Sequence, residues 1–426
     1  MSPYEQFKAE CEEEIALQDN AKNSPFFSVV IPTRNRHETL LYVLQTCLKQ
    51  VDFDDYEVII SDNSDPDNNL CYEAVKQYIG GKVRYIKPPH VLSMTMHYEW
   101  ILDHVRGEYV TYTGDDDGLT RDALYSCYKC IDETKSLAVT SINLCYIWPQ
   151  VFDDDTKNSR AWLWKFFPKE TNLYTKLISK SYLNKFLDFD IPYQFLPSIY
   201  RGMIAQKLIA SIRKRYGKFF DSYSPDVYSA MLVATQTEYF VYINRPIFII
   251  GTSRFSTGLN LDCRKQDRKL LDTIISQPPR EGYNCAYVQV NMLASALMDS
   301  IMCIAEIMPI KLNYCAYYRE ALKELRTFTL SMQKEKFRAL MQDALKNNKK
   351  SIIYICTLRE ILCRIKKILC SPVAKFKTLV KRIPMIYKIY RVLRYGDYAN
   401  PVQNVVVTGF SDVDSLVEYF KLDFGN

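Results

Sequence analysis

Three consecutive aspartates, Asp115, Asp116 and Asp117, follow directly on the apolar stretch 108–113. Adjacent like charges repel, and a buried carboxylate has a large desolvation cost unless a partner compensates it. Carboxylate oxygens are preferred ligands of hard divalent cations such as Mg²⁺ and Mn²⁺, which usually keep positions open for phosphate oxygens. We therefore expect a metal site here. The alternative is a helix cap, but a cap requires one acid and not three.

The aspartates lie in a part of the sequence where strand and helix patterns alternate regularly. Apolar stretches predict four strands, at 26–31, 56–61, 83–87 and 108–113, and a helical pattern follows each of them. This order predicts an α/β fold with a mostly parallel sheet and helices on both faces. Open sheets of this kind bind ligands beyond the carboxyl ends of their strands. Polar groups gather there, in PTRNR after the first strand, DNS after the second and GDDDG after the fourth.

The ordered set SVVIPTRNR, YEVIISDNS and GEYVTYTGDDDGL resembles the donor-binding half of family 2 inverting glycosyltransferases with the GT-A fold, over residues 25–130. The resemblance implies an enzyme of the bacterial surface-glycan type. It also implies a nucleotide-diphosphate sugar as donor, usually a UDP-sugar, and Mn²⁺ or Mg²⁺ as cofactor.

The resemblance also implies a role for individual residues. The nucleotide-sugar site would consist of Pro32, Thr33, Arg34, Arg36, Asp62, Asn63, Asp115 and Asp117. Within it, the first three would line the base pocket and Asp62 would contact the nucleobase. Asp115 would lie near the ribose and Asp117 on the side of the donor sugar. Asp116 would be the direct metal ligand, and the metal would bridge the diphosphate.

An inverting transfer also needs a general base that deprotonates the acceptor hydroxyl. Asp226, in DSYSPDVYS, precedes a helical pattern about where similar enzymes carry their base, and Asp221 is the rival candidate. Ser224 or Asp226 can instead serve as a helix cap. Downstream, 245–258 predicts a strand and then a polar loop that can close over a ligand. The QxxRW motif of processive relatives is absent from the sequence, which argues against a processive polymerase.

The composition divides the chain into an N-terminal extension (1–24), a GT-A domain (25–258), a helical region (259–345) and a basic amphipathic region (346–426). Residues 346–394 hold 14 Lys or Arg and one acid, a net +13; subtracting this from the total of +6 leaves −7 for the rest. In 359–394, cations lie opposite apolar stripes, as in helices on an anionic membrane. The alternative is a basic face on ordinary packed helices. Nucleic-acid binding is disfavoured because the aromatic residues lie in the apolar stripe.

The remaining composition is that of a globular protein, with 48% hydrophobic and 24% charged residues. Thirteen cysteines and an N-terminus without an export signal predict a cytoplasmic protein. The apolar stretch 288–310 contains Asp299 and Glu306, and it predicts a core helix and not a membrane span.

We therefore expect transfer of a sugar to a hydroxyl of a lipid-linked or surface-polysaccharide acceptor, at the inner face of the plasma membrane. The alternatives are a catalytically inactive scaffold with the same fold and a sugar nucleotidylyltransferase. The latter class usually has a Gly-rich loop after the first strand, and PTRNR contains no glycine.

Overall fold

The computed structural model describes residues 24–149, 151, 160–163, 173–256, 277–280, 283, 290, 292–328, 330–358, 407–408 and 412–417. The predicted membrane segment 359–394, nearly all of the N-terminal extension and the boundary at residue 258 lie outside the described residues.

The first half of the fold is a parallel sheet, with strand order β3-β2-β1-β4. Its strands are β1 (Phe27–Thr33), β2 (Tyr56–Asp62), β3 (Val83–Ile86) and β4 (Tyr109–Tyr112). Every residue of β1 and β2 is buried, as expected for parallel strands that helices cover on both faces. The connecting helices are α2 (His37–Leu48), α3 (Leu70–Val75), α4 (Met94–Ile101) and α5 (Ala123–Thr134). The four predicted strands and their parallel arrangement are confirmed.

The second half of the sheet is mixed. Here β9 (Gly202–Ala205) lies antiparallel between β4 and β6 (Ala138–Ile147), and β7 (Arg160–Leu163) is antiparallel to β6. The long strand β10 (Tyr239–Thr252) runs parallel to β6 and antiparallel to β5 (Gly118–Leu119) and β8 (Tyr174–Ile178). Register shifts around Pro246 interrupt β10, because proline has no N–H to donate to the ladder. The α/β fold class is therefore confirmed, with an all-parallel order in the first half and mixed pairing in the second.

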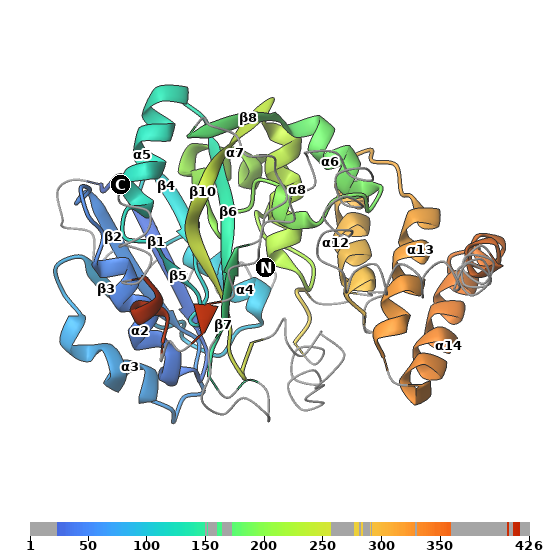
Figure 1. Ribbon diagram of the computed structural model, residues 1–426, viewed down its shortest axis with the longest axis horizontal. Coiled ribbons are helices and arrows are strands. Elements are labelled where there is room, and N and C mark those ends of the chain that lie inside the picture. Colours follow the sequence, from blue (N-terminus) through green and yellow to red (C-terminus); the bar gives the residue numbers. More distant parts are fainter. Residues whose placement is uncertain are drawn as a thin grey trace, which may run out of the picture.

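Helices cover the second half and extend away from it (Figure 1). Those nearest the sheet are α6 (Ser179–Leu187), α7 (Gln206–Tyr216) and α8 (Pro225–Gln236); beyond them lie α12 (Leu293–Ile307), α13 (Tyr314–Glu324), α14 (Leu330–Lys346) and a helix at 350–358. The prediction of a core helix within 288–310 is confirmed, because α12 packs on α8 and buries one side. In the described part of the chain, no helix is both long and apolar enough to cross a membrane.

The described residues near the C-terminus return to the α/β domain. Strand β11 (Val407–Thr408) pairs with β7. The helical turn at 413–417 lies beside α2 (Figure 1), where Val413, Leu416 and Val417 are buried and Lys49 Nζ contacts Asp414 Oδ2 at 2.5 Å. These residues fall within the predicted region 346–426, but they pack on the domain that carries the aspartates.

Candidate active site

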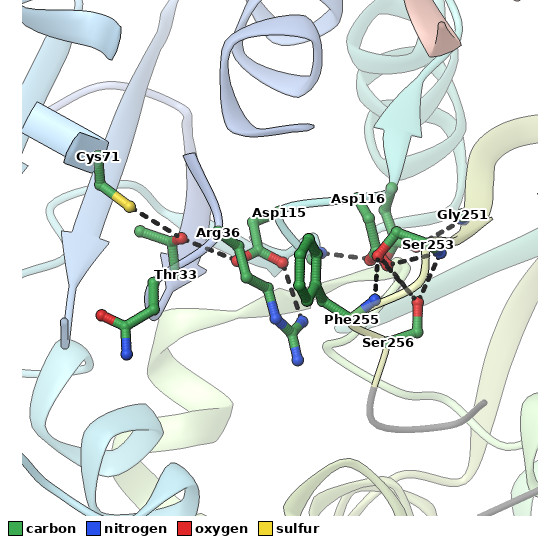
Figure 2. Close-up of polar contacts among 12 residues, drawn as sticks. Thr33, Arg36, Cys71, Asp115, Asp116, Gly251, Ser253, Phe255 and Ser256 are labelled. Atoms are coloured by element: carbon green, nitrogen blue, oxygen red, sulfur yellow. Dashed lines mark hydrogen bonds and ion pairs between the residues drawn. The ribbon is translucent and has the colours of Figure 1, made fainter. Parts of the chain in front are cut away.

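The ends of β1, β2 and β4 bring the predicted donor-binding residues to one edge of the sheet. Thr33 is in register with Asp62, and the N–H of Thr113 donates to Val30 O at 2.9 Å, so the aspartates follow directly beside β1. Thr33 Oγ1 donates to Asp115 Oδ2 at 2.8 Å, as Figure 2 shows.

Asp115 also forms an ion pair with Arg36, whose Nη1 lies 3.1 Å from Asp115 Oδ1 (Figure 2). Burial raises the pKa of Asp115 to about 6, although the nearby charge of Arg36 acts in the opposite direction. Burial disfavours the charged form of Arg36, but the nearby carboxylates of Asp115 and Asp116 favour that form more strongly, so the pKa of Arg36 is raised. Arg36 is thus a permanent positive charge beside Asp115.

The other predicted donor-binding residues lie around the same edge. Asp62 accepts hydrogen bonds from Ser64 N at 2.9 Å and from the Tyr85 hydroxyl at 2.5 Å. The Asn63 amide group is engaged with the backbone of Leu92, donating at 2.8 Å and accepting at 2.9 Å, so it fixes the loop before α4.

The segment after β1 is anchored on both sides. Pro32 is buried within β1. Arg34 Nη1 donates to Gln277 Oε1 at 2.8 Å, and Arg34 Nη2 lies 3.6 Å from Asp65 Oδ1. Asn35 has a φ of 57°, which turns the chain between β1 and α2.

Asp116 is bound by the loop that follows β10. Its Oδ2 accepts hydrogen bonds from Ser253 N at 3.1 Å, from Ser253 Oγ at 2.7 Å and from Ser256 Oγ (Figure 2). Its backbone oxygen accepts from Trp148 Nε1 at 2.7 Å. A Cβ on Gly251 would lie 1.5 Å from that oxygen, so only glycine fits there.

The arrangement around Asp116 fits a cation that takes most of its ligands from a substrate. In the described residues, no three His, Cys, Asp or Glu side chains converge as a metal cage. No hydrogen bond to Asp116 Oδ1 is found in that part of the chain, whereas Oδ2 is held by the two serines. One carboxylate, completed by phosphate oxygens and water, is a common way of holding Mg²⁺.

Asp117 is held by the backbone and by an arginine. It accepts from Gly114 N at 3.0 Å and from Gly251 N at 2.8 Å, and Arg201 Nε lies 3.6 Å from its Oδ2. Burial raises the pKa of Asp117, and the charge of Arg201 opposes the rise. The helix-cap alternative for the three aspartates is wrong, because β5 separates them from α5, whose N-cap is Asp122.

The two candidate bases lie in different surroundings. Asp226 is in the first turn of α8, where burial raises its pKa and a hydrogen bond with the Tyr193 hydroxyl opposes the rise. Asp221 forms an ion pair with Arg280, with 3.2 Å between Asp221 Oδ2 and Arg280 Nη1. Within the described residues, no such ion pair involves Asp226. Ser224 is the N-cap residue of α8 but makes no side-chain cap hydrogen bond.

The segment that leads to both acids is fixed by a buried carboxylate on α4. Glu99 accepts from Phe219 N at 3.0 Å and from Phe220 N at 2.9 Å, and Arg213 Nε donates to it at 2.8 Å. The start of α8 is therefore tied to α4.

Sequence reasoning missed several residues of this site. No motif indicated Arg201 or Tyr193, which lie on a connection between strand patterns. Ser253 and Ser256 fall in the polar loop predicted to close over a ligand, and their hydrogen bonds to Asp116 place that loop at the site. The only sequence signal for them was the small, polar composition of that loop.

The chain was compared with protein families, curated proteins and solved structures. Residues 28–189 match the model of the family described as Glycosyl transferase family 2. The matched part contains the three aspartates, and the mixed, helix-covered sheet around it is that of a GT-A-like glycosyltransferase domain. No curated protein sequence matches the chain.

Two solved structures illustrate the similarity. S. aureus TarS 1–349 in complex with UDP-GlcNAc is 13% identical, with 77% of this chain and 90% of that chain covered and a TM-score of 0.43. The mannosyltransferase PcManGT from Pyrobaculum calidifontis, in complex with GDP-Man and Mn²⁺, is 14% identical, with 84% and 97% covered and a TM-score of 0.41. The chain covers 55% of the longer TarS structure.

Proposed function

We propose that this protein is a metal-dependent inverting glycosyltransferase that moves a sugar from a nucleotide-diphosphate donor, a UDP-sugar in the first instance, to an acceptor hydroxyl. The observation that carries this proposal is the distribution of charge among four aspartates. Arg36 lies beside Asp115 and Arg201 beside Asp117. Asp116 and Asp226 have no ion-pair partner among the described residues, so they are the carboxylates available for a cation and for a proton.

In this proposal each of the four aspartates has a separate role in binding or catalysis. The nucleotide lies along Thr33, Asp62 and Asp115, and Asp117 faces the donor sugar. Asp116 would hold Mn²⁺ or Mg²⁺, which would supply Lewis-acid stabilisation of the charge that develops on the departing nucleoside diphosphate. A bound dication would also reduce the repulsion among the buried carboxylates of the site.

Asp226 accepts the proton of the acceptor hydroxyl as that oxygen attacks the anomeric carbon. Its raised pKa brings it closer to neutral pH, where a base is more effective, and the Tyr193 hydrogen bond and Arg201 favour its ionised form. Asp221 is a poorer base because its carboxylate is engaged by Arg280.

The acceptor is proposed to be a lipid-linked or surface-polysaccharide glycan, reached from the cytoplasmic face of the membrane. The +13 net charge of residues 346–394 supports this, because an anionic bilayer would repel the rest of the chain, which carries −7. The segment 359–394 is proposed to supply that contact.

The base assignment is tested by comparing Asp226→Asn with Asp221→Asn. We expect Asp226→Asn to leave donor binding near wild type and to reduce turnover about 10²–10⁴-fold, the usual range for a lost general base. We expect Asp221→Asn to retain most turnover. The reverse ranking of the two variants would assign the base to Asp221.

A further inference from the structure

Residues 277–280, with the sequence QPPR, form a short segment that reaches both sides of the candidate site. At one end, Gln277 Oε1 accepts a hydrogen bond at 2.8 Å from Arg34 Nη1, in the turn after β1. At the other end, Arg280 Nη1 lies 3.2 Å from Asp221 Oδ2, in the connection before α8. The segment therefore joins the donor side of the site to the connection that leads to the candidate base.

The Arg280 end of this segment is anchored by contacts with two other elements. While its Nη1 reaches Asp221, its Nη2 lies 2.9 Å from Glu306 Oε2 on α12. The guanidinium also lies over the Tyr283 ring, 5.2 Å from its centroid. The Tyr283 hydroxyl in turn donates at 2.7 Å to Asp299 Oδ2, a buried carboxylate on α12. Arg280 is thus held between α12 and the connection before α8.

The connection before α8 is itself fixed by hydrogen bonds. Ser222 Oγ lies 2.8 Å from Ser300 Oγ on α12, and Ser222 O accepts from Thr95 Oγ1 on α4 at 2.7 Å. Ser222 also has a φ of 65°, a left-handed conformation that the surrounding contacts must maintain. Asp221 directly precedes it, and its side chain is 8% exposed. Asp221 therefore offers Arg280 a partner in a fixed place.

Two prolines transmit the position of Arg280 to Gln277. The proline ring holds φ near −65°, so the backbone has little freedom at Pro278 and Pro279. Pro279 is buried as well, which fixes the middle of the segment against its surroundings. A shift at Arg280 is therefore passed on to Gln277, because little of it can be absorbed between them.

Arg34 depends on Gln277 for its placement. Its other charged partner is Asp65, whose Oδ1 lies 3.6 Å from Arg34 Nη2. The side chain of Asp65 is 59% exposed and that of Arg34 is 31% exposed, and ion pairs open to solvent contribute little. The hydrogen bond to Gln277 is shorter, at 2.8 Å, and it comes from an anchored segment. Gln277 therefore fixes the direction of the Arg34 side chain.

We propose that Gln277 is a positioning residue for Arg34 in the nucleobase pocket, and that Arg280 anchors the segment that presents Gln277. This proposal rests on the proposed function, in which the nucleotide lies along Thr33, the residue before Arg34. The segment lies outside residues 28–189, the part of the chain that matches the family model. Donor recognition then depends on the helical region as well, through the contact of Arg280 with α12.

The test measures binding of UDP and of GDP to the full-length protein by calorimetric titration with Mn²⁺ present, and the denaturant midpoint of unfolding of the same samples. The variants are Gln277→Ala, Gln277→Glu, Arg280→Met and the combination of Gln277→Ala with Arg280→Met. The matched control is Arg319→Met. Arg319 on α13 is 48% exposed, against 39% for Arg280, and it likewise joins the helical region to the α/β domain, through Asp190 and the backbone oxygen of Asp188.

We expect Gln277→Ala to lower UDP affinity about 3–10-fold, less than for a buried hydrogen bond to a charged group because Arg34 is partly exposed. Gln277→Glu should keep the wild-type affinity, since a carboxylate accepts the same hydrogen bond. Arg280→Met should lower UDP affinity by a similar factor, although Arg280 binds acids on the other side of the segment. The double variant should be no more than about twofold weaker than Gln277→Ala, because both changes act through Arg34. Arg319→Met should lower the unfolding midpoint and leave UDP affinity unchanged.

The comparison of UDP with GDP separates the positioning of Arg34 from a general loss of structure. Because Arg34 acts at the base, Gln277→Ala and Arg280→Met should narrow the preference between the two nucleotides. Equal weakening of both nucleotides would overturn the proposal. Wild-type UDP affinity in Arg280→Met, or losses that multiply in the double variant, would also overturn it. If Arg280→Met does not fold, Arg280→Gln takes its place in the same comparison.

Failure of the proposed function has a different signature. A wild-type protein that binds UDP but releases it from no sugar donor would contradict the proposed activity, and the test above would still apply because it measures binding alone. If the wild type binds neither nucleotide, the anchoring is measured from the unfolding midpoints. An effect of Gln277→Ala that disappears in the Arg280→Met background would then support the anchoring, and losses that simply add would refute it.

Discussion

Replacing Ser253 and Ser256 by alanine should weaken metal-dependent nucleotide binding without unfolding the protein. Each serine hydroxyl donates a hydrogen bond to Asp116 Oδ2, and Ser253 also donates its N–H to the same atom at 3.1 Å. Either alanine removes one hydroxyl and leaves the N–H contact in place. Asp116 is thereby less well fixed for holding a cation through Oδ1.

The expected size of the effect follows from these contacts. A hydrogen bond to a charged group contributes about 1.5–3 kcal/mol, and each 1.4 kcal/mol corresponds to about tenfold in affinity. Outer partners of metal ligands typically change metal affinity by about 10–100-fold when they are removed. We therefore expect each single variant to weaken the Mn²⁺-dependent part of UDP binding about 10–100-fold.

The assay is calorimetric titration of UDP with and without Mn²⁺, with thermal unfolding of the same samples. Ser28→Ala is the matched control, because Ser28 Oγ donates to Glu57 Oε1 at 2.7 Å, at the other end of the strands. It should lower stability and leave UDP binding unchanged. Unchanged or tighter Mn²⁺-dependent binding in the Ser253 and Ser256 variants would refute the reasoning, since tighter binding would mean that the serines compete with the cation.

Three other outcomes are expected. Burial lowers the pKa of His97 to about 3, so the unfolded chain binds this proton before the folded protein does as the pH falls below about 6.5. The unfolding free energy of the wild type, relative to that of His97→Gln, should therefore drop by about 1.4 kcal/mol per pH unit between about pH 6 and 4. Parallel urea titrations that show no difference between the two proteins would contradict this. Because the pKa of Asp226 is raised, the acid limb of the pH–rate profile for kcat should have an apparent pKa above the ordinary carboxyl value of about 4. An apparent pKa at or below that value would contradict the assignment. Replacing the basic residues of 359–394 by glutamine, with residues 413–417 and their buried contacts kept, should abolish salt-sensitive co-sedimentation with anionic vesicles. Each cation near the surface is expected to contribute about 1 kcal/mol to the binding. Binding that depends on neither lipid charge nor salt would rule out the membrane contact.

The sequence predicts the first half of the fold well because its signals are local. The four strands, their helices and the polar strand ends follow from short apolar runs and turn residues. The second half is harder, because the antiparallel insertion of β9 and the long β10 depend on pairing between distant segments. The return of residues 407–408 and 412–417 to the domain likewise depends on long-range contacts without a local signal.

The candidate site likewise contains residues that the sequence indicates locally and residues that only long-range contacts bring together. Asp115, Asp116 and Asp117 are visible in the sequence because three adjacent carboxylates need compensation. Arg36 and Arg201, which compensate two of them, look like ordinary basic residues until the strands bring them together. The proposed preference for Asp226 over Asp221 also depends on the structure, because the partners that distinguish the two acids, Tyr193 and Arg280, are distant in sequence.

The most direct test of the central claim is a panel of nucleotide-diphosphate sugars, assayed for release of the nucleoside diphosphate in the presence of Mn²⁺ or Mg²⁺. The proposed function predicts that wild-type protein releases the nucleoside diphosphate from at least one donor, a UDP-sugar first of all. It also predicts that chelation of the metal or Asp116→Asn abolishes that release while the protein remains folded. Release that persists unchanged in Asp116→Asn would contradict the metal assignment, and a wild-type protein that releases nothing from any donor would contradict the proposed activity.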